Sequence, residues 1–217
     1  MRGAIIWDWN GTLLNDVEVC IAAMNRLLGR RGLGELTVER YREVFTFPVQ
    51  IYYERMGFDF NRESFADVAV EYHDEYEELV LGAELHRDAR TALQSFRERG
   101  VRQAILSALE ESRLRNELRT RGIDEYFSHA YGLSDLNAIS KAERGSELLE
   151  VLGRESSIWM IGDTVHDAEV AETMGINSVL VECGHHTSQL LRGTGVPLFP
   201  SLTEAVTYVQ KAMDQEE

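Results

Sequence analysis

The sequence predicts an α/β fold in which a parallel, Rossmann-like sheet lies between layers of helices, together with an all-helical insertion. Short and nearly continuous apolar segments, such as residues 157–162, are typical of strands that are buried on both faces. These segments alternate with amphipathic helical stretches, which favours parallel strands joined by right-handed crossovers. Residues 15–82 show helical periodicity and no strand pattern. We therefore predict a core domain at residues 1–14 and 83–217 and a helical insertion at residues 15–82.

The composition restricts the partners of the chain. It has 217 residues and a formal charge of −15, so a nucleic acid or an anionic membrane would be repelled over much of its surface. It contains no apolar run of the roughly 18 residues that suggest a membrane span, and we expect a cytoplasmic protein that is a monomer or a homodimer. Cys20 and Cys183 lie far apart without zinc-ligand spacing, and we expect both to be buried thiols.

The first strand, at residues 4–7, leads directly into the insertion. Apolar residues at helical spacing predict a first helix over residues 16–31, and Thr37 is a suitable cap for a second. Phe47–Pro48 should end that second helix, because proline cannot continue it, and a third helix follows. A fourth helix is predicted at about residues 63–81.

The remaining chain is predicted to complete the sheet. A capping box from Ser140 to Glu143 should open one helix, and Gly153 should close it. The predicted strands span residues 101–107, 127–131, 157–162 and 177–181, and the predicted helices span residues 87–99, 112–121, 140–152, 164–175 and 201–213.

Chemically useful side chains follow several of these strands. Asp8 follows the first strand, Ser107 ends the second, and Asp163 follows the fourth, with Asp167 one helical turn later and Lys141 opening a helix. The carboxyl ends of parallel strands lie at one edge of a sheet, where α/β proteins bind ligands. Purely structural roles are also open: Ser107 as a turn residue, Lys141 as an exposed side chain, Asp167 as a capping acid. Taken together, the five residues should converge on one site.

These residue types suit a metal ion and a phosphate group. Asp8 and Asp163 offer the hard oxygen ligands that Mg²⁺ prefers. Ser107, Thr12 and the ammonium of Lys141 can hold phosphate oxygens, assisted by backbone amides at the start of a helix. Positive charge from Mg²⁺ and Lys141 would let an anionic phosphate approach a carboxylate nucleophile.

The set of residues resembles the four motifs of the haloacid dehalogenase superfamily. The motifs are Asp8-Trp9-Asn10-Gly11-Thr12, Ser107, Lys141 and Gly162-Asp163-Thr164-x-x-Asp167, in the right order over roughly residues 4–181. Phosphatases with a helical cap after the first strand look most similar, in particular phosphoglycolate phosphatase-like members. The resemblance implies a Mg²⁺-dependent phosphatase that acts on small phosphorylated metabolites, such as phosphoglycolate-like monoesters.

The resemblance also implies individual roles. Asp8 is the expected nucleophile, which forms an aspartyl-phosphate. The expected Mg²⁺ ligands are Asp8, the backbone carbonyl of Asn10, Asp163 and Asp167, the last either as a direct ligand or through a neighbour. The expected phosphate-binding residues are Ser107, Lys141 and Thr12, of which Thr12 would also steady the loop.

Asn10 departs from the pattern, because the family's phosphatases carry an aspartate there that protonates the leaving oxygen and later activates water. An amide cannot exchange a proton at ordinary pH, and losing a positioned acid or base typically lowers the rate about 10²- to 10⁴-fold. The enzyme could be restricted to good leaving groups, such as acyl or aryl phosphates. A residue of the insertion or its exit could instead supply the proton, the candidates being His73, Asp74, Glu75 and His86. Alternatively, turnover is slow or absent and the chain is a phosphate-binding module.

Two other chemistries of the superfamily fit less well. Phosphonoacetaldehyde hydrolases resemble this motif but need a lysine in the cap, and residues 15–82 contain none. Dehalogenases do not need Mg²⁺, whereas residues 162–167 resemble the metal-binding form. We expect His166 to face solvent, and neither it nor His185 or His186 to be catalytic.

Overall fold

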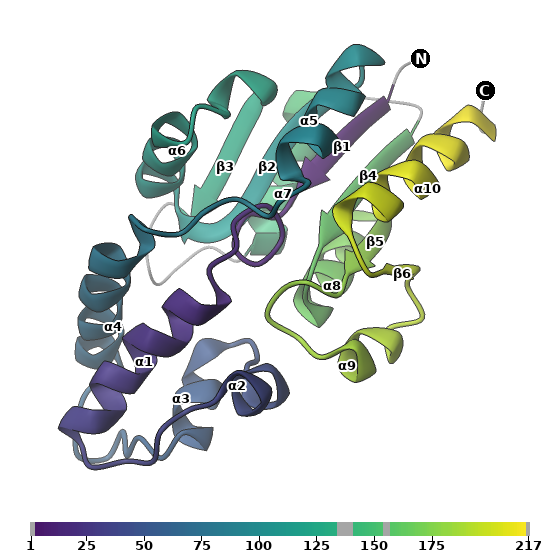
Figure 1. Ribbon diagram of the computed structural model, residues 1–217. Helices are drawn as coiled ribbons and strands as arrows, with labels where there is room; N and C mark the ends of the chain where they lie inside the picture. The colour runs from purple at the N-terminus through teal and green to yellow at the C-terminus, as the bar shows by residue number, and fades with distance from the viewer. Residues whose placement is uncertain (1–2, 134–140, 154–156, 216–217) are drawn as a thin grey trace.

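The computed structural model describes residues 3–133, 141–153 and 157–215, which form a six-stranded parallel sheet flanked by helices (Figure 1). This confirms the predicted α/β, Rossmann-like fold. The strand order is β3-β2-β1-β4-β5-β6. Strand β6 was not predicted, because two residues are too few to show a periodic pattern. The strands are β1 (Gly3–Trp7), β2 (Arg102–Glu110), β3 (His129–Leu133), β4 (Ser157–Gly162), β5 (Asn177–Val181) and β6 (Leu198–Phe199).

Helices cover both faces of the sheet, because successive side chains of a strand point to opposite sides. Ile5 and Trp7 of β1 pack into the core beneath α5, α6 and α10, whereas Ala4 and Ile6 pack beneath α7 and α8. These core helices, with two short ones, are α5 (Ala89–Glu98), α6 (Glu111–Thr120), η1 (Asp124–Tyr126), α7 (Lys141–Leu152), α8 (Val165–Met174), α9 (Ser188–Arg192) and α10 (Leu202–Gln215).

Between β1 and α5 the chain forms a separate helical layer, here called the α1–α4 layer (Figure 1). It consists of α1 (Val17–Arg30), α2 (Val38–Val44), α3 (Val49–Arg55) and α4 (Phe65–Val80). Thr37 caps α2 as predicted, its Oγ1 accepting a hydrogen bond from the Arg40 amide at 3.2 Å. The Phe47–Pro48 peptide bond, which is cis, separates α2 from α3. Within the described ranges, no helix combines the length and apolar character needed to cross a membrane.

Strands β1 and β4 end side by side, which brings the residues that follow them together. Trp7 pairs with Ile161 in parallel register, and the Asp8 amide donates to the Ile161 carbonyl at 2.9 Å. Gly11 then turns the chain with φ of 78°. A Cβ at this position would lie 2.4 Å from Asp163 Oδ2, so only glycine lets the loop approach that carboxylate. Asp8 and Asp163 therefore emerge next to each other at one edge of the sheet.

Candidate active site

A buried lysine joins two of the predicted carboxylates. Lys141 is the first residue of α7 and only 5% exposed, and its Nζ donates to Asp8 Oδ1 and, at 2.6 Å, to Asp167 Oδ1. Burial alone would lower the pKa of Lys141, but the carboxylates of Asp167 and Asp8 outweigh it and raise the pKa above its ordinary value. The lysine therefore remains a cation inside the site and is not an exposed helix-end residue.

Asp163 is held by two donors from distant segments. The Thr12 hydroxyl donates to its Oδ1 and the His185 amide to its Oδ2, each at 2.7 Å. Burial, together with nearby Asp167, raises the pKa of Asp163 to about 6, although His185 opposes this. Thr12 is fully buried and its hydroxyl is used by Asp163. Its observed contact therefore orients a predicted metal ligand.

Asp167 combines a structural role with a place in the site. Its Oδ2 accepts from the Thr164 amide at 2.9 Å, and its own amide donates back to Thr164 Oγ1, which makes a capping box at the start of α8. Burial would raise the pKa of Asp167, but Lys141 and the Thr164 hydrogen bonds lower it. The capping box predicted before α7 involves Ser140, which lies outside the described residues.

Three carboxylates of this site could hold a metal ion. Ligand atoms of Asp8, Asp163 and Asp167 lie within 4.8 Å of one another, and all three residues are buried. Burial and, more weakly, the charges of Asp167 and Asp163 raise the pKa of Asp8 well above its ordinary value, although Lys141 opposes this. The single ammonium of Lys141 cannot balance three carboxylates. A cluster of hard oxygen donors with excess negative charge fits Mg²⁺, so the donor set agrees with the predicted cofactor.

Ser107 lies beside this cluster in β2. It is buried, and it lines the same cavity as Asp8 and Lys141. Its Oγ also accepts a hydrogen bond from the Leu109 amide at 3.0 Å. Ser107 thus makes a hydrogen bond within its own strand, and its hydroxyl proton is still available to a ligand in the cavity.

The Asn10 side chain makes hydrogen bonds to residues of the α1–α4 layer and of the loop before it. Its Nδ2 donates to Asp16 Oδ2 and to Tyr76 Oη, both at 2.8 Å, and the adjacent Gly11 amide donates to Asp16 Oδ1 at 2.9 Å. The Asn10 amide therefore links the loop after β1 to helix α4. It offers no proton to a leaving group.

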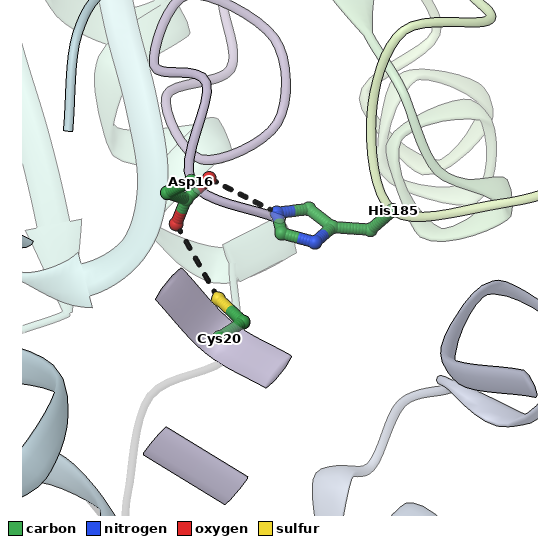
Figure 2. Close-up of side chains that lie close together, drawn as sticks. All are labelled: Asp16, Cys20 and His185. Atoms are coloured by element: carbon green, nitrogen blue, oxygen red, sulfur yellow. Dashed lines mark hydrogen bonds and ion pairs between the residues drawn. The ribbon is translucent and has the colours of Figure 1, made fainter. Parts of the chain in front are cut away.

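Asp16, Cys20 and His185 form a buried cluster that the sequence did not indicate. Figure 2 shows the His185 and Cys20 side chains pointing to different carboxylate oxygens of Asp16. His185 Nε2 lies 3.4 Å from Oδ1, and Cys20 Sγ lies 3.5 Å from Oδ2. Burial opposes both charges, but their attraction lowers the pKa of Asp16 to about 2 and raises that of His185 to about 9. The pair is thus ionised.

One cavity of about 160 Å³ is lined by most of these groups, although not by Asp163 or Thr12. On the core side it is lined by Asp8, Asn10, Ser107, Ala108, Leu109, Lys141, Thr164, His166, Asp167 and His185, and on the side of the α1–α4 layer by Asp16, Cys20, Tyr41, Phe45, Phe47, Val49, Tyr72, His73 and Tyr76. The prediction that His166 faces solvent is wrong. Phe47, which belongs to the α1–α4 layer, stacks on the His166 ring with centroids 4.6 Å apart and covers it.

The four candidate proton donors of the insertion lie in different places. Only His73 lines the cavity, and burial lowers its pKa. Asp74 is exposed, and Glu75 pairs with Arg26 of α1 at 2.6 Å. His86 Nε2 lies 3.0 Å from the Gly11 carbonyl oxygen. His73 is therefore the member of this group that could meet a substrate.

The fold and the site define an α/β enzyme whose centre is built from aspartates and one lysine. Residues 5–181 match the model of the haloacid dehalogenase-like hydrolases, and the chain belongs to this family. The family prediction made from the four motifs is confirmed.

Several known proteins are similar over most of their length. A phosphoglycolate phosphatase of Rhodobacter capsulatus is 26% identical over 195 residues, which cover 88% of this chain and 89% of the relative. Pyrophosphatase PpaX of Halalkalibacterium halodurans is 23% identical over 180 residues, 82% of each chain. The solved haloacid dehalogenase-like hydrolase SP0104 of Streptococcus pneumoniae has a TM-score of 0.82 at 19% identity, covering 95% of this chain and 97% of its own. That structure has the same fold.

Proposed function

We propose that the chain is a Mg²⁺-dependent phosphatase that hydrolyses phosphate monoesters of small molecules through an aspartyl-phosphate on Asp8. The observation that carries the proposal is the Lys141 ammonium, which contacts both Asp8 and Asp167 inside the cavity. A phosphoryl group on Asp8 would meet this cation directly. The names of the two curated relatives, a phosphoglycolate phosphatase and a pyrophosphatase, support phosphoester or phosphoanhydride hydrolysis.

The residues would act in two displacements at phosphorus. A carboxylate oxygen of Asp8 forms a bond to phosphorus while the bond to the leaving oxygen breaks. Lys141 and the Ser107 hydroxyl hold the phosphoryl oxygens. Water then attacks the same phosphorus, which releases inorganic phosphate and restores the Asp8 carboxylate. Mg²⁺ held by the carboxylates of this site would supply further positive charge to the phosphate.

The residues around the centre would keep these groups in place. We assign the metal ligands to Asp8, Asp163, Asp167 and the backbone carbonyl of Asn10, and Thr12 to the orientation of Asp163. Residues 15–82 would act as a cap over residues 1–14 and 83–217, because one cavity is lined from both sides. Closure of such a layer excludes water during the transfer.

The proposal is tested by incubating the purified protein with phosphate monoesters and measuring the inorganic phosphate that is released. We expect release that requires Mg²⁺ and is abolished by EDTA, and a loss of at least about 10³-fold in Asp8→Asn. Mass spectrometry of acid-quenched enzyme should show one added phosphoryl group, located on Asp8. Asp67→Asn, an exposed carboxylate of α4, is the matched control and should keep full activity.

Two results would point elsewhere. Activity that persists in Asp8→Asn would show that Asp8 is not the nucleophile. If the natural protein releases no phosphate from any substrate while Asn10→Asp becomes active, the chain is a phosphate-binding module. One observation favours the phosphate-binding module: the Asn10 amide is held by Asp16 and Tyr76 and cannot protonate a leaving group.

A further inference from the structure

We propose that the substrates are aryl phosphates, in which a phenolic ring lies in the aromatic half of the cavity and leaves as a phenolate. The inference rests on the proposed function, since it names the substrate class of that same site. It differs from the phosphoglycolate-like substrates that the resemblance implies. Three features carry it: the wall of the cavity, its charge, and the chemistry of Asn10.

The α1–α4 layer covers the site with aromatic side chains. The rings that line the cavity from this layer are Tyr41, Phe45, Phe47, Tyr72 and Tyr76. Neighbouring rings already pack on one another: Tyr41 stacks on Phe45 at 5.2 Å, and Phe45 meets Phe47 edge to face at 5.4 Å. A further ring could join this array in the offset or edge-to-face geometries that aromatic pairs prefer.

Two of the tyrosine hydroxyls of this wall are used within the protein. The Tyr41 hydroxyl lies 2.8 Å from His185 Nδ1, and the Tyr76 hydroxyl donates to Asp16 Oδ2 at 2.8 Å. The Asp16 carboxylate is balanced by His185 and accepts from Asn10. Because these groups satisfy one another, Tyr41 and Tyr76 offer ring carbons to a substrate, as Phe45 and Phe47 do, and His73 is a polar group of the same wall.

The charge of the cavity disfavours a second anionic group on the substrate. Among the described residues that line it, Lys141 is the sole lysine or arginine, and the sequence of residues 134–140 contains neither. Asp8 and Asp167, which share the Lys141 ammonium, line the same space, and the charge of the cavity-lining His185 is already used by Asp16. A carboxylate such as that of phosphoglycolate, or a second phosphate, would be buried beside these acids without a cation of its own, which is strongly unfavourable.

A neutral ring avoids this cost and fits the available space. The cavity volume of about 160 Å³ is of the same order as the roughly 150 Å³ apolar cavity known to bind benzene. His166, stacked on Phe47 at 4.6 Å, extends the aromatic surface toward the core and faces Glu169 through its Nδ1 at 3.5 Å. A phenyl ring between the layers would therefore contact aromatic groups from both.

Asn10 selects for the same class of substrate by its chemistry. In the first displacement the bond between phosphorus and the leaving oxygen breaks, and its electron pair stays on that oxygen. A phenol has a pKa near 10, whereas water, as a guide to aliphatic alcohols, has a pKa of about 15.7. A phenolate can therefore depart unprotonated and take its proton from solvent afterwards. An alkoxide needs the proton that Asn10 cannot supply.

Four substrates separate the effect of the ring from that of the leaving group: phenyl phosphate, benzyl phosphate, acetyl phosphate and 2-phosphoglycolate, each with Mg²⁺. Phenyl phosphate should give the highest kcat/KM. The kcat/KM of benzyl phosphate should be lower at least about 10²-fold. Acetyl phosphate should keep kcat but show a higher KM, and 2-phosphoglycolate should be the poorest substrate.

Two variants test the two halves of the inference. Asn10→Asp should reduce the ratio of kcat/KM for phenyl over benzyl phosphate by about 10²-fold, since an acid then protonates the poorer leaving group. Phe47→Ala should raise KM for phenyl phosphate about 3- to 10-fold more than for acetyl phosphate. This factor is the expected effect on binding of losing one contact between two aromatic rings. Phe60→Ala, which removes a ring of the same layer that does not line the cavity, is the matched control and should leave both constants unchanged.

Turnover of 2-phosphoglycolate at or above the kcat/KM of phenyl phosphate overturns the inference. If that turnover is lost in Asp8→Asn, the proposed function stands and only the substrate class is wrong. Equal kcat/KM for phenyl and benzyl phosphate likewise refutes the role of Asn10, because kcat/KM reports the first displacement. Absence of turnover with all four substrates overturns the inference and the proposed activity together.

Discussion

Raising the pH from 6.5 to 9 should destabilise the metal-free protein, because it discharges the buried His185 that pairs with Asp16. The folded pKa of His185 is about 9, above its ordinary value of 6.5. A raised histidine pKa contributes stability that is fully present below pH 6.5 and is lost as the pH rises through 9. The pKa of Asp16 is lowered to about 2, so that its own contribution is lost only in acid, between about pH 4 and 2.

The size of the effect follows from the shift. At about 1.36 kcal/mol per pKa unit, the rise from 6.5 to about 9 corresponds to about 3 kcal/mol of stability at pH 6.5 and well under 1 kcal/mol at pH 9. This is a large share of the 5–15 kcal/mol typical of folded proteins, and therefore measurable.

Urea unfolding in EDTA at several pH values between 6.5 and 9 measures this slope. His185→Gln should be less stable at pH 6.5 and should lack the decrease toward pH 9. His186→Gln is a matched control, because burial lowers the pKa of the neighbouring His186, so that its titration does not reduce the stability as the pH rises. The reasoning is refuted if the natural protein loses less than about 1 kcal/mol, or if His185→Gln keeps the natural slope.

Three further changes test the site and its supports. Lys141→Met should lower kcat/KM about 10²- to 10³-fold, because the phosphate loses its cation; unchanged kinetics in a variant that folds normally by circular dichroism would contradict this. Thr12→Val removes the hydroxyl that donates to Asp163 and should weaken Mg²⁺ binding about 10- to 100-fold by calorimetry, with Thr12→Ser restoring it. Gly184→Ala should also weaken Mg²⁺ binding, since its Cβ would lie 1.9 Å from Asp163 Oδ2. The control is Gly29→Ala in α1, where a Cβ meets nothing within 4 Å. This control should stabilise the protein by about 1 kcal/mol in urea unfolding. Equal Mg²⁺ affinity in Gly184→Ala and Gly29→Ala would show that the close approach at Gly184 is unimportant.

The positions of the motif residues could be predicted because they follow from local patterns. An apolar strand that ends in an acid can be recognised from a few neighbouring residues, and parallel topology then brings Asp8 and Asp163 to one edge. The capping role of Asp167 was likewise readable from its spacing to Thr164. What these patterns could not show is that Lys141 would be buried between two carboxylates, because burial depends on what packs over the helix start.

The surroundings of the site were beyond local patterns. Asp16 looked like an ordinary residue at a helix start, and nothing near it in the chain pointed to His185. His166 was predicted to face solvent from its helix position alone, and Phe47 from the other layer covers it. In each case the deciding contact joins segments that are far apart in sequence and that periodicity cannot pair.

The sequence by itself thus determined the fold class, the family and the strand-end residues, since apolar periodicity and motif spacing depend on nearby residues. It also identified Asn10 as the position where the expected acid is missing. Only the tertiary structure decided what surrounds that position: Asp16 and Tyr76 hold the Asn10 amide, and aromatic side chains of the α1–α4 layer line the same cavity. The physical reason is that burial, ion pairing and cavity shape arise when the two layers pack together, and no single segment of the chain contains that information.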